Sequence, residues 1–279
     1  MTIGRVRRLT PADADEILRI VDVEGLDATA LTRELTARDD YLWVGLTSPG
    51  GGLGAVHRSM RWGSHLLLKG VFVDDSARGS GASLELGFAT REFARDSGYA
   101  GIAAWVEPHK PEAGLARMLR LRTSGPLLHR FDIPVPDGDR PARVPGPVDR
   151  SRVLDLPRRA PAAPLVADVL ADHDEFGPTG GATRVHWVLD RHRLVLSGFP
   201  GRSVADLGEL VSAATPLARA HGARFIEFPM QAADLSATLS LAAAGARRLS
   251  RTPVRIGRLH FAPDAAPAPV TTTEGADRR

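Results

Sequence analysis

The sequence predicts an α+β protein with a mixed sheet, built as two similar units in tandem. The first part of the chain reads as a helix, three antiparallel strands, a helix, a strand, a helix and a strand, an order typical of an α+β domain. The last five elements of this order, strand, helix, strand, helix and strand, return from residue 193 on, beyond a segment rich in proline. A local echo supports a duplication: Ala89-Thr90 and Ala94-Arg95 before Gly98 return as Ala214-Thr215 and Ala218-Arg219 before Gly222.

The amino-acid composition excludes several classes of protein and of chemistry. The 279 residues contain no apolar run of about 18 residues, and no apolar stretch follows the charged N-terminus, so we expect a soluble, cytoplasmic protein without a membrane partner. The absence of cysteine excludes disulfides, thiolate metal sites and a cysteine nucleophile. The formal net charge is only +3 and the arginines are scattered, which argues against a nucleic-acid partner. No histidine pattern indicates a metal site.

Each element of the first unit follows from a local signal. Thr10, Pro11 and Asp13 form the pattern of a capped helix start, and apolar spacing carries that helix to about Val23. Later helices are expected from Ser83 to Asp96, ended by Gly98, and over 113–121. Strands are expected over 41–48, 53–62, 65–73, 99–108 and 127–135.

The second unit has its own set of elements, and breaks in the pattern divide the chain. Strands are expected over 193–199, 223–230 and 253–261, with helices over 203–221 and 234–244. Prolines crowd the segment after residue 135, and periodicity disappears there. We therefore predict a first unit over 1–135, a linker over 136–164, a second unit over 165–262 and a disordered tail over 263–279.

The segment Arg78-Gly79-Ser80-Gly81-Ala82-Ser83 carries the strongest functional signal. It lies between an apolar strand that ends at Val73 and a helix that begins near Ser83. A helix N-terminus has unpaired amide hydrogens and a partial positive charge, so a preceding turn of small residues lets several N–H groups bind one phosphate group. A Walker A loop would need a lysine before Ser or Thr, and a dinucleotide fingerprint would need a third glycine where Leu84 stands.

What remains resembles motif A of the GCN5-related N-acetyltransferase (GNAT) superfamily, in which Gln or Arg is followed after two residues by Gly, and after one more by Gly or Ala. Arg78, Gly81 and Ser83 take these positions, and Ser83 departs from the last one. The resemblance extends over the first unit and implies a tandem GNAT fold with a degenerate second unit, because the segment 197–208 lacks a phosphate loop. The tandem layout is similar to that of the mycothiol synthases.

The resemblance implies that acetyl-CoA is the co-substrate and that the partners are an acyl-CoA and a small-molecule or peptide amine. The pantetheine arm would lie along Gly70, Val71, Phe72 and Val73, and the pyrophosphate would bind to Arg78, Gly79, Ser80, Gly81, Ala82 and Ser83. A backbone N–H near Phe72 or Val73 would polarise the thioester carbonyl. The chain would be a monomer or a homodimer.

The catalytic groups of the family are only partly present. Members commonly carry a carboxylate on the strand equivalent to 65–73, and a tyrosine on a later helix that protonates the thiolate. Neither is found here, and His65 and Glu107 are the candidate general bases, with His109 as a substitute for the tyrosine. The sequence therefore favours an acyl-CoA-dependent N-acyltransferase, and the alternative is a non-catalytic protein that binds CoA or a metabolite as a sensor or scaffold.

Overall fold

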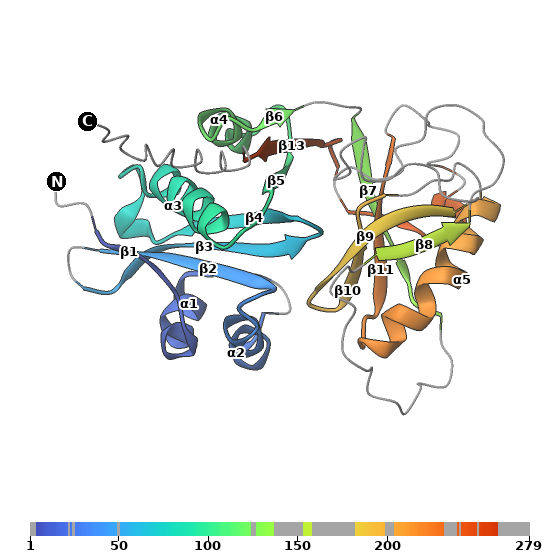
Figure 1. Cartoon of the computed structure of the whole chain (residues 1–279), viewed down its shortest axis with the longest axis horizontal. Helices are drawn as coiled ribbons and strands as arrows, with labels where there is room; N and C mark the ends of the chain where they lie inside the picture. Colours follow the sequence, from blue (N-terminus) through green and yellow to red (C-terminus); the bar gives the residue numbers. More distant parts are fainter. Residues whose placement is uncertain are drawn as a thin grey trace, which may run out of the picture.

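The fold consists of two mixed β-sheets, each covered by helices (Figure 1). It is seen in a computed structural model, and no helix among its described residues is long and apolar enough to cross a membrane. The structure describes residues 4–21, 23, 26–48, 51–123, 127–136, 153–157, 182–198, 204–231, 239, 241–249 and 251–261.

The first sheet has seven strands in the order β1-β2-β3-β4-β5-β13-β6. Their bounds are Val6–Arg8 (β1), Tyr41–Thr47 (β2), Leu53–Trp62 (β3), His65–Val73 (β4), Gly101–Val106 (β5), Arg255–His260 (β13) and Arg122–Thr123 (β6). Figure 1 shows one helix pair on each face of this sheet. The helices α3 (Ala82–Asp96) and α4 (Pro111–Met118) cover one face, and α1 (Ala14–Ile20) and α2 (Ala28–Thr36) cover the other.

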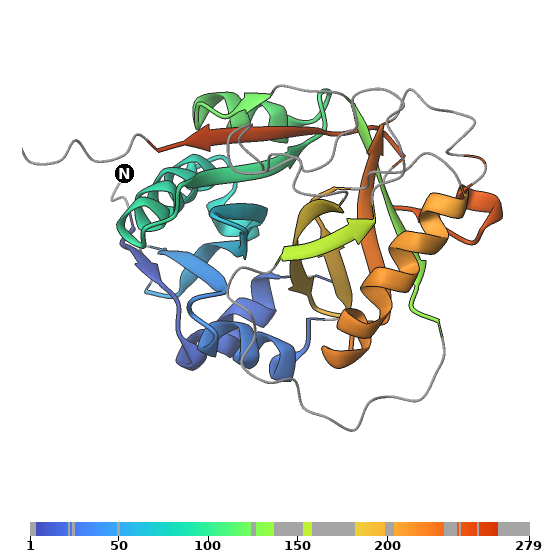
Figure 2. The same cartoon turned by 45° about the vertical axis from the view of Figure 1, so that its right-hand side comes forward.

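The second sheet has six strands in the order β12-β7-β11-β10-β9-β8. Their bounds are Arg247–Arg248 (β12), Leu128–Pro134 (β7), Phe225–Gln231 (β11), Arg193–Leu196 (β10), Ala182–Asp190 (β9) and Val153–Pro157 (β8). Helix α5 (Val204–Ala220) covers the face directed away from the first sheet (Figure 2). Its apolar side chains, with those of the sheet, form the core of this unit.

The two units exchange their closing strands. β13, near the C-terminus, inserts between β5 and β6 of the first sheet, while β7 inserts between β11 and β12 of the second. The strands meet where Leu128 and Val254 exchange two backbone hydrogen bonds of 2.8 Å. The prediction that 127–135 closes the first unit and 253–261 the second is therefore wrong. Alternation of apolar residues identifies a strand but does not say which sheet it joins.

Most other expected elements agree with the structure. β3 and β4 have the predicted bounds, and the first helix is a 3₁₀ turn at Pro11–Asp13 followed by α1. The helix α2, capped by Asp27, was not predicted. The expected linker contains the strand β8, and the rest of it after residue 136 lies outside the described residues, as do the expected tail over 263–279 and most of the expected helix over 234–244.

Apolar and ionic contacts join the units. An apolar cluster contains buried residues from both, namely Met60, Trp62, Leu67, Ala103, Leu128, Val188, Val195, Val254 and Ile256. Beside it, Arg58 of β3 binds Glu34 of α2 and Asp190 at the end of β9. All three side chains are almost fully buried, so the second unit shares a charged network with the first.

Candidate functional site: a cavity between two parting strands

The parallel strands β4 and β5 pair only over their first residues. Their register runs from His65 opposite Gly101 to Leu68 opposite Ala104. Beyond this point β4 continues along β3, but no ladder to β5 is formed in this fully described segment. A bulge at Lys69, where the register with β3 shifts, marks the start of the separation. The unpaired edge of β4 therefore faces a gap.

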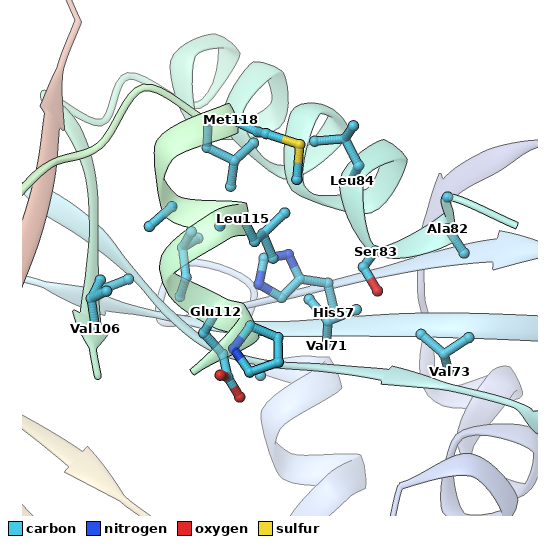
Figure 3. A pocket seen from close by; sticks show the side chains of 18 of the residues that line it. His57, Val71, Val73, Ala82, Ser83, Leu84, Val106, Glu112, Leu115 and Met118 are labelled. Carbon is cyan, nitrogen blue, oxygen red and sulfur yellow. The ribbon is translucent and has the colours of Figure 1, made fainter. Parts of the chain in front are cut away.

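A cavity of about 720 Å³ occupies this gap (Figure 3). It is lined by the unpaired part of β4, the end of β5, the glycine loop (residues 78–83), the first turn of α3 and the length of α4. Small side chains dominate the wall formed by the loop and by Ala104, which leaves the space open. In Figure 3, Val71 and Val73 lie on one side of the cavity, with Ser83 and Leu84 at the start of α3 and Leu115 and Met118 on α4.

Most of the residues expected to bind the co-substrate line this cavity. They are Gly70, Val71, Val73, Arg78, Gly79, Gly81, Ala82 and Ser83. Two others do not line it. Phe72 packs against the cluster beneath α1 and α2 on the opposite face of the sheet, and the hydroxyl of Ser80 donates a hydrogen bond of 2.6 Å to the Ala77 carbonyl.

The loop before α3 presents several backbone amides without a partner. Within this described segment, no hydrogen bond satisfies the amides of Gly79, Gly81, Ala82 and Ser83, and no side chain caps the helix. The amide of Ser80 is the exception, because it donates to the Ala77 carbonyl at 3.3 Å. Four partner-free donors within five residues beside an open cavity can bind an anion such as a diphosphate.

Glycine is required in this loop by the backbone conformation. Gly79 and Gly81 have φ values of +77° and +84°, in the left-handed region that other residues rarely adopt. A Cβ at either position would meet no atom within 4 Å. The two glycines therefore leave open space in front of the amides.

His65 lies away from the cavity. It stands at the paired end of β4, is 1% exposed, and its Nε2 lies 3.2 Å from Nδ1 of His260 on the exchanged strand. Its ring packs edge-on against that histidine. The position speaks against His65 as general base, because three residues of paired strand separate it from the gap.

Glu107 also lies outside the cavity lining, and both its oxygens are engaged. Lys110 donates to Oε1 at 3.0 Å, and the Thr252 hydroxyl donates to Oε2. These two donors, Thr252 first, lower the pKa of Glu107 below its ordinary value. A carboxylate held in this way is a weak base. His109 is exposed and does not line the cavity either.

Two ionisable residues of the cavity wall, Glu112 and His57, were missed by sequence reasoning. Glu112, in the first turn of α4, is a carboxylate of the lining and lies at its lower edge in Figure 3. His57 of β3 is buried beneath α3, where its Nδ1 lies 2.7 Å from the Thr90 hydroxyl. Burial lowers the pKa of His57 to about 4, so its ring is neutral at neutral pH. An apolar strand pattern carries no sign that such a side chain faces a cavity.

A third ionisable residue of the cavity wall is Lys69, at the bulge and on the same strand as His65. Its Nζ lies 2.8 Å from Oδ2 of Asp190, which the second unit supplies. Lys69 and Arg58 hold the pKa of Asp190 well below its ordinary value despite its burial. Their contact across 121 positions of sequence could not be read from spacing. Within the described part of the chain, no group of three or more His, Asp or Glu side chains is arranged to hold a metal.

Comparisons with known proteins find likeness in structure alone. No protein-family model matches the chain, and no curated protein matches it. A GCN5-related N-acetyltransferase from Sphaerobacter thermophilus is 16% identical, with 93% of this chain and 96% of that one covered and a TM-score of 0.48. A tandem GNAT protein from the clavulanic acid biosynthesis pathway is 14% identical, with 94% and 99% covered and a TM-score of 0.48.

A single-unit protein overlaps less of the chain. The PaiA N-acetyltransferase from Thermoplasma acidophilum, solved with coenzyme A, is 11% identical, with 44% of this chain and 92% of that one covered and a TM-score of 0.37. Identities this low identify neither a substrate nor an activity. The α+β class and the two tandem units expected from the sequence are confirmed, with two mixed sheets in one chain and a parallel pair that parts before a glycine loop.

Proposed function

We propose that the protein is an acyl-CoA-dependent N-acyltransferase, with acetyl-CoA as the donor and an amine as the acceptor. The observation that carries this proposal is the cavity between β4 and β5, which ends at four partner-free loop amides. The diphosphate of CoA is the group that these amides suit. The free edge of β4 offers backbone groups to the amides of the pantetheine arm.

The dimensions of the gap agree with this assignment. From Val73, beside the loop, to Lys69, where the strands meet, β4 advances four residues, or about 13 Å at ~3.3 Å per residue. An extended chain of the length of the pantetheine arm spans such a distance. The thioester would then lie near the bulge at Lys69, where a backbone N–H of β4 polarises its carbonyl.

Transfer requires no covalent intermediate on the protein. The amine nitrogen forms a bond to the thioester carbon, the carbon–sulfur bond breaks, and CoA leaves as a thiolate. A thiol of pKa about 8.5 leaves readily without a general acid. The ammonium proton of the acceptor must be lost first, and we assign its acceptance to Glu112, directly or through water, because this carboxylate lines the cavity.

A second candidate function is a non-catalytic protein that binds CoA. It is favoured by the positions of His65 and Glu107, which both lie outside the cavity lining, and by the neutral, buried state of His57. Its binding site would be the same cavity. The two functions differ in turnover and not in binding.

The experiment that tests the proposal has two parts. Thermal unfolding of the full chain with acetyl-CoA at about a hundredfold its dissociation constant is expected to show roughly 2.7 kcal/mol of stabilisation. Free CoA is then measured with a panel of amines, and release above the hydrolysis background supports the transferase. Stabilisation without release by any amine supports the non-catalytic alternative, and no stabilisation contradicts both.

A further inference from the structure

Two hydrogen-bond donors flank the point where β4 and β5 part. The last paired residues are Leu68 and Ala104, so Lys69 and Trp105 are the first residues beyond the ladder, one on each strand. Both line the cavity. Both side chains lie on the face of the sheet directed toward the second unit, because Lys69 contacts Asp190 and Trp105 packs near Trp62 and Arg130.

The ammonium of Lys69 has unused hydrogen-bonding capacity. It carries three N–H donors, and its one described partner is Oδ2 of Asp190. The side chain is only 13% exposed, so bulk water does not freely solvate the remaining donors. Asp190 itself is shared, because its Oδ1 accepts from Arg58 at 2.9 Å.

The indole of Trp105 also carries a hydrogen-bond donor that is not used within the described part of the chain. Its Nε1 is buried and has no hydrogen-bond partner among the described residues. A buried donor without a partner costs stability in the ligand-free protein. Nε1 of Trp62, whose ring packs against Trp105, is likewise buried without a described partner, but Trp62 does not line the cavity. A ligand that brings hydrogen-bond acceptors to the point where the strands part would satisfy the donors of Lys69 and Trp105.

The surrounding charges indicate which ligand fits. The carboxylates on this face are already engaged: Glu34 by Arg58, Asp190 by Arg58 and Lys69, and Glu107 by Lys110 and Thr252. The ionisable side chain that reaches the cavity from this face is thus a cation. A polyamine would meet repulsion here, whereas an anionic oxygen group would gain an ionic partner and two donors.

We propose that Lys69 and Trp105 bind a carboxylate of the acceptor, so that the substrate class is an amine that carries a carboxylate, as amino acids do. This inference rests on the proposed transferase function and names the acceptor for the same site. Asp190 is a positioning residue, since it holds Lys69 from the second unit. The second unit then contributes to acceptor recognition without a phosphate loop of its own.

Matched substrates test the inference directly. Amino acids, each paired with its own amide, are assayed with acetyl-CoA and the full chain, and the expected result is a higher kcat/KM for the amino acid. Lys69→Met keeps the aliphatic stem and removes the ammonium, and Trp105→Phe keeps a ring and removes the N–H. Each variant is expected to raise KM for the amino acid about 10-fold, with little effect on the amide. The dissociation constant of acetyl-CoA, measured by calorimetry, should change less than about twofold.

A spectroscopic readout keeps the inference testable if no amino acid in the panel is a substrate. Trp105 is one of four tryptophans, so its indole N–H signal in ¹⁵N NMR is assigned by its loss in Trp105→Phe. In the CoA-bound protein, addition of acetate or propionate is expected to shift this signal, and acetamide or propionamide is not. In Lys69→Met, the carboxylate should shift it far less.

Defined results overturn the inference. The first is an equal kcat/KM for amino acids and their amides. The second is an equal fall in kcat for both in Lys69→Met, which would place the ammonium on the thioester oxygen. The third is an indole N–H signal that does not shift when a carboxylate is added. Thermal unfolding of each variant checks that it folds, and Trp105→Phe is informative alone should Lys69→Met fail this check. Absence of any CoA binding by the unmodified protein would instead contradict the proposed function itself.

Discussion

The two units use the same sheet design to different ends, and their interiors show the difference. In both, the parallel strands pair over a few residues only, His65 to Leu68 of β4 with β5 and Arg193 to Val195 of β10 with β11, and an antiparallel strand covers the other edge of β5 and of β11. In the first unit, a cavity lies where β4 and β5 separate. The interior beside α5 contains large buried aromatic side chains, namely Phe131, Trp187 and Phe228.

Side-chain size accounts for much of this difference. The core between the first sheet and α3 has no aromatic residue among its fully buried members, and alanines occur at several of its positions. Gly87 lets α3 approach α4 closely, because a Cβ there would lie 3.0 Å from Leu119. A tandem fold can thus keep one unit open for a ligand and fill the other with aromatic rings, without a change in sheet topology.

The largest expected effect concerns the exchanged strands. A segment of residues 1–136 lacks β13, so the edge of β5 that pairs with six residues of β13 would be exposed. We expect this segment to show no cooperative unfolding transition by circular dichroism. The control joins residues 1–123 through a glycine-serine linker to residues 251–261, which supplies the strand and should restore cooperativity. Cooperative unfolding of 1–136 alone would show that the exchange is not needed for stability.

The ionic network between the units predicts the next largest effect. Arg58→Met leaves the carboxylates of Glu34 and Asp190 buried with one cation fewer, and removal of one partner from a buried ion pair costs about 3–5 kcal/mol. Urea unfolding measures the loss. Arg95→Met, which removes a surface pair with Glu92, is the matched control and should cost no more than ~1 kcal/mol. Similar losses in both variants would contradict a structural role for the network.

A smaller effect is expected from the pH dependence of stability. Burial lowers the pKa of His57 to about 4 in the folded chain, against an ordinary value of 6.5 for histidine. The unfolded chain therefore binds the proton more readily, so stability is complete above pH 6.5 and falls as the pH drops toward 4, by up to about 3 kcal/mol. Unfolding of the unmodified chain and of His57→Gln, compared over this pH range, measures the effect. An equally steep dependence in the variant would assign it to other groups.

Local features were readable from the sequence, and long-range ones were not. The bounds of β3 and β4 follow from their apolar patterns and flanking glycines, and the turn before α3 follows from the position of Gly79 and Gly81 between a strand and a helix. These signals lie within a few residues of each other. The helix α2 was missed although the sequence carries its signals, since Asp27 caps it and the buried Leu31 and Leu35 lie one turn apart.

The candidate catalytic residues His65 and Glu107 lie outside the cavity lining, for His65 because of strand register. His65 was chosen because it is ionisable and lies on β4, but a four-residue ladder places it at the closed end of the strand pair. Lys69 also lies on β4, and the bulge and Asp190 that set its position depend on neighbours distant in sequence. The register between two strands decides whether a side chain lies in their paired part or beside the gap. Register depends on both strands, so the sequence of one strand does not predict it.

The central claim is that the partner-free amides of the loop bind the diphosphate of CoA, and two glycine variants measured by calorimetry test it most directly. Gly81→Ala and Gly98→Ala both place a methyl group at a left-handed residue with no atom within 4 Å, one at the start of α3 and one just past its end. Each is expected to lose about 1–2 kcal/mol of stability. We expect CoA affinity to fall at least about tenfold in Gly81→Ala and to change less than about twofold in Gly98→Ala. Equal affinities in the two variants, or no CoA binding by the unmodified chain, would contradict the claim.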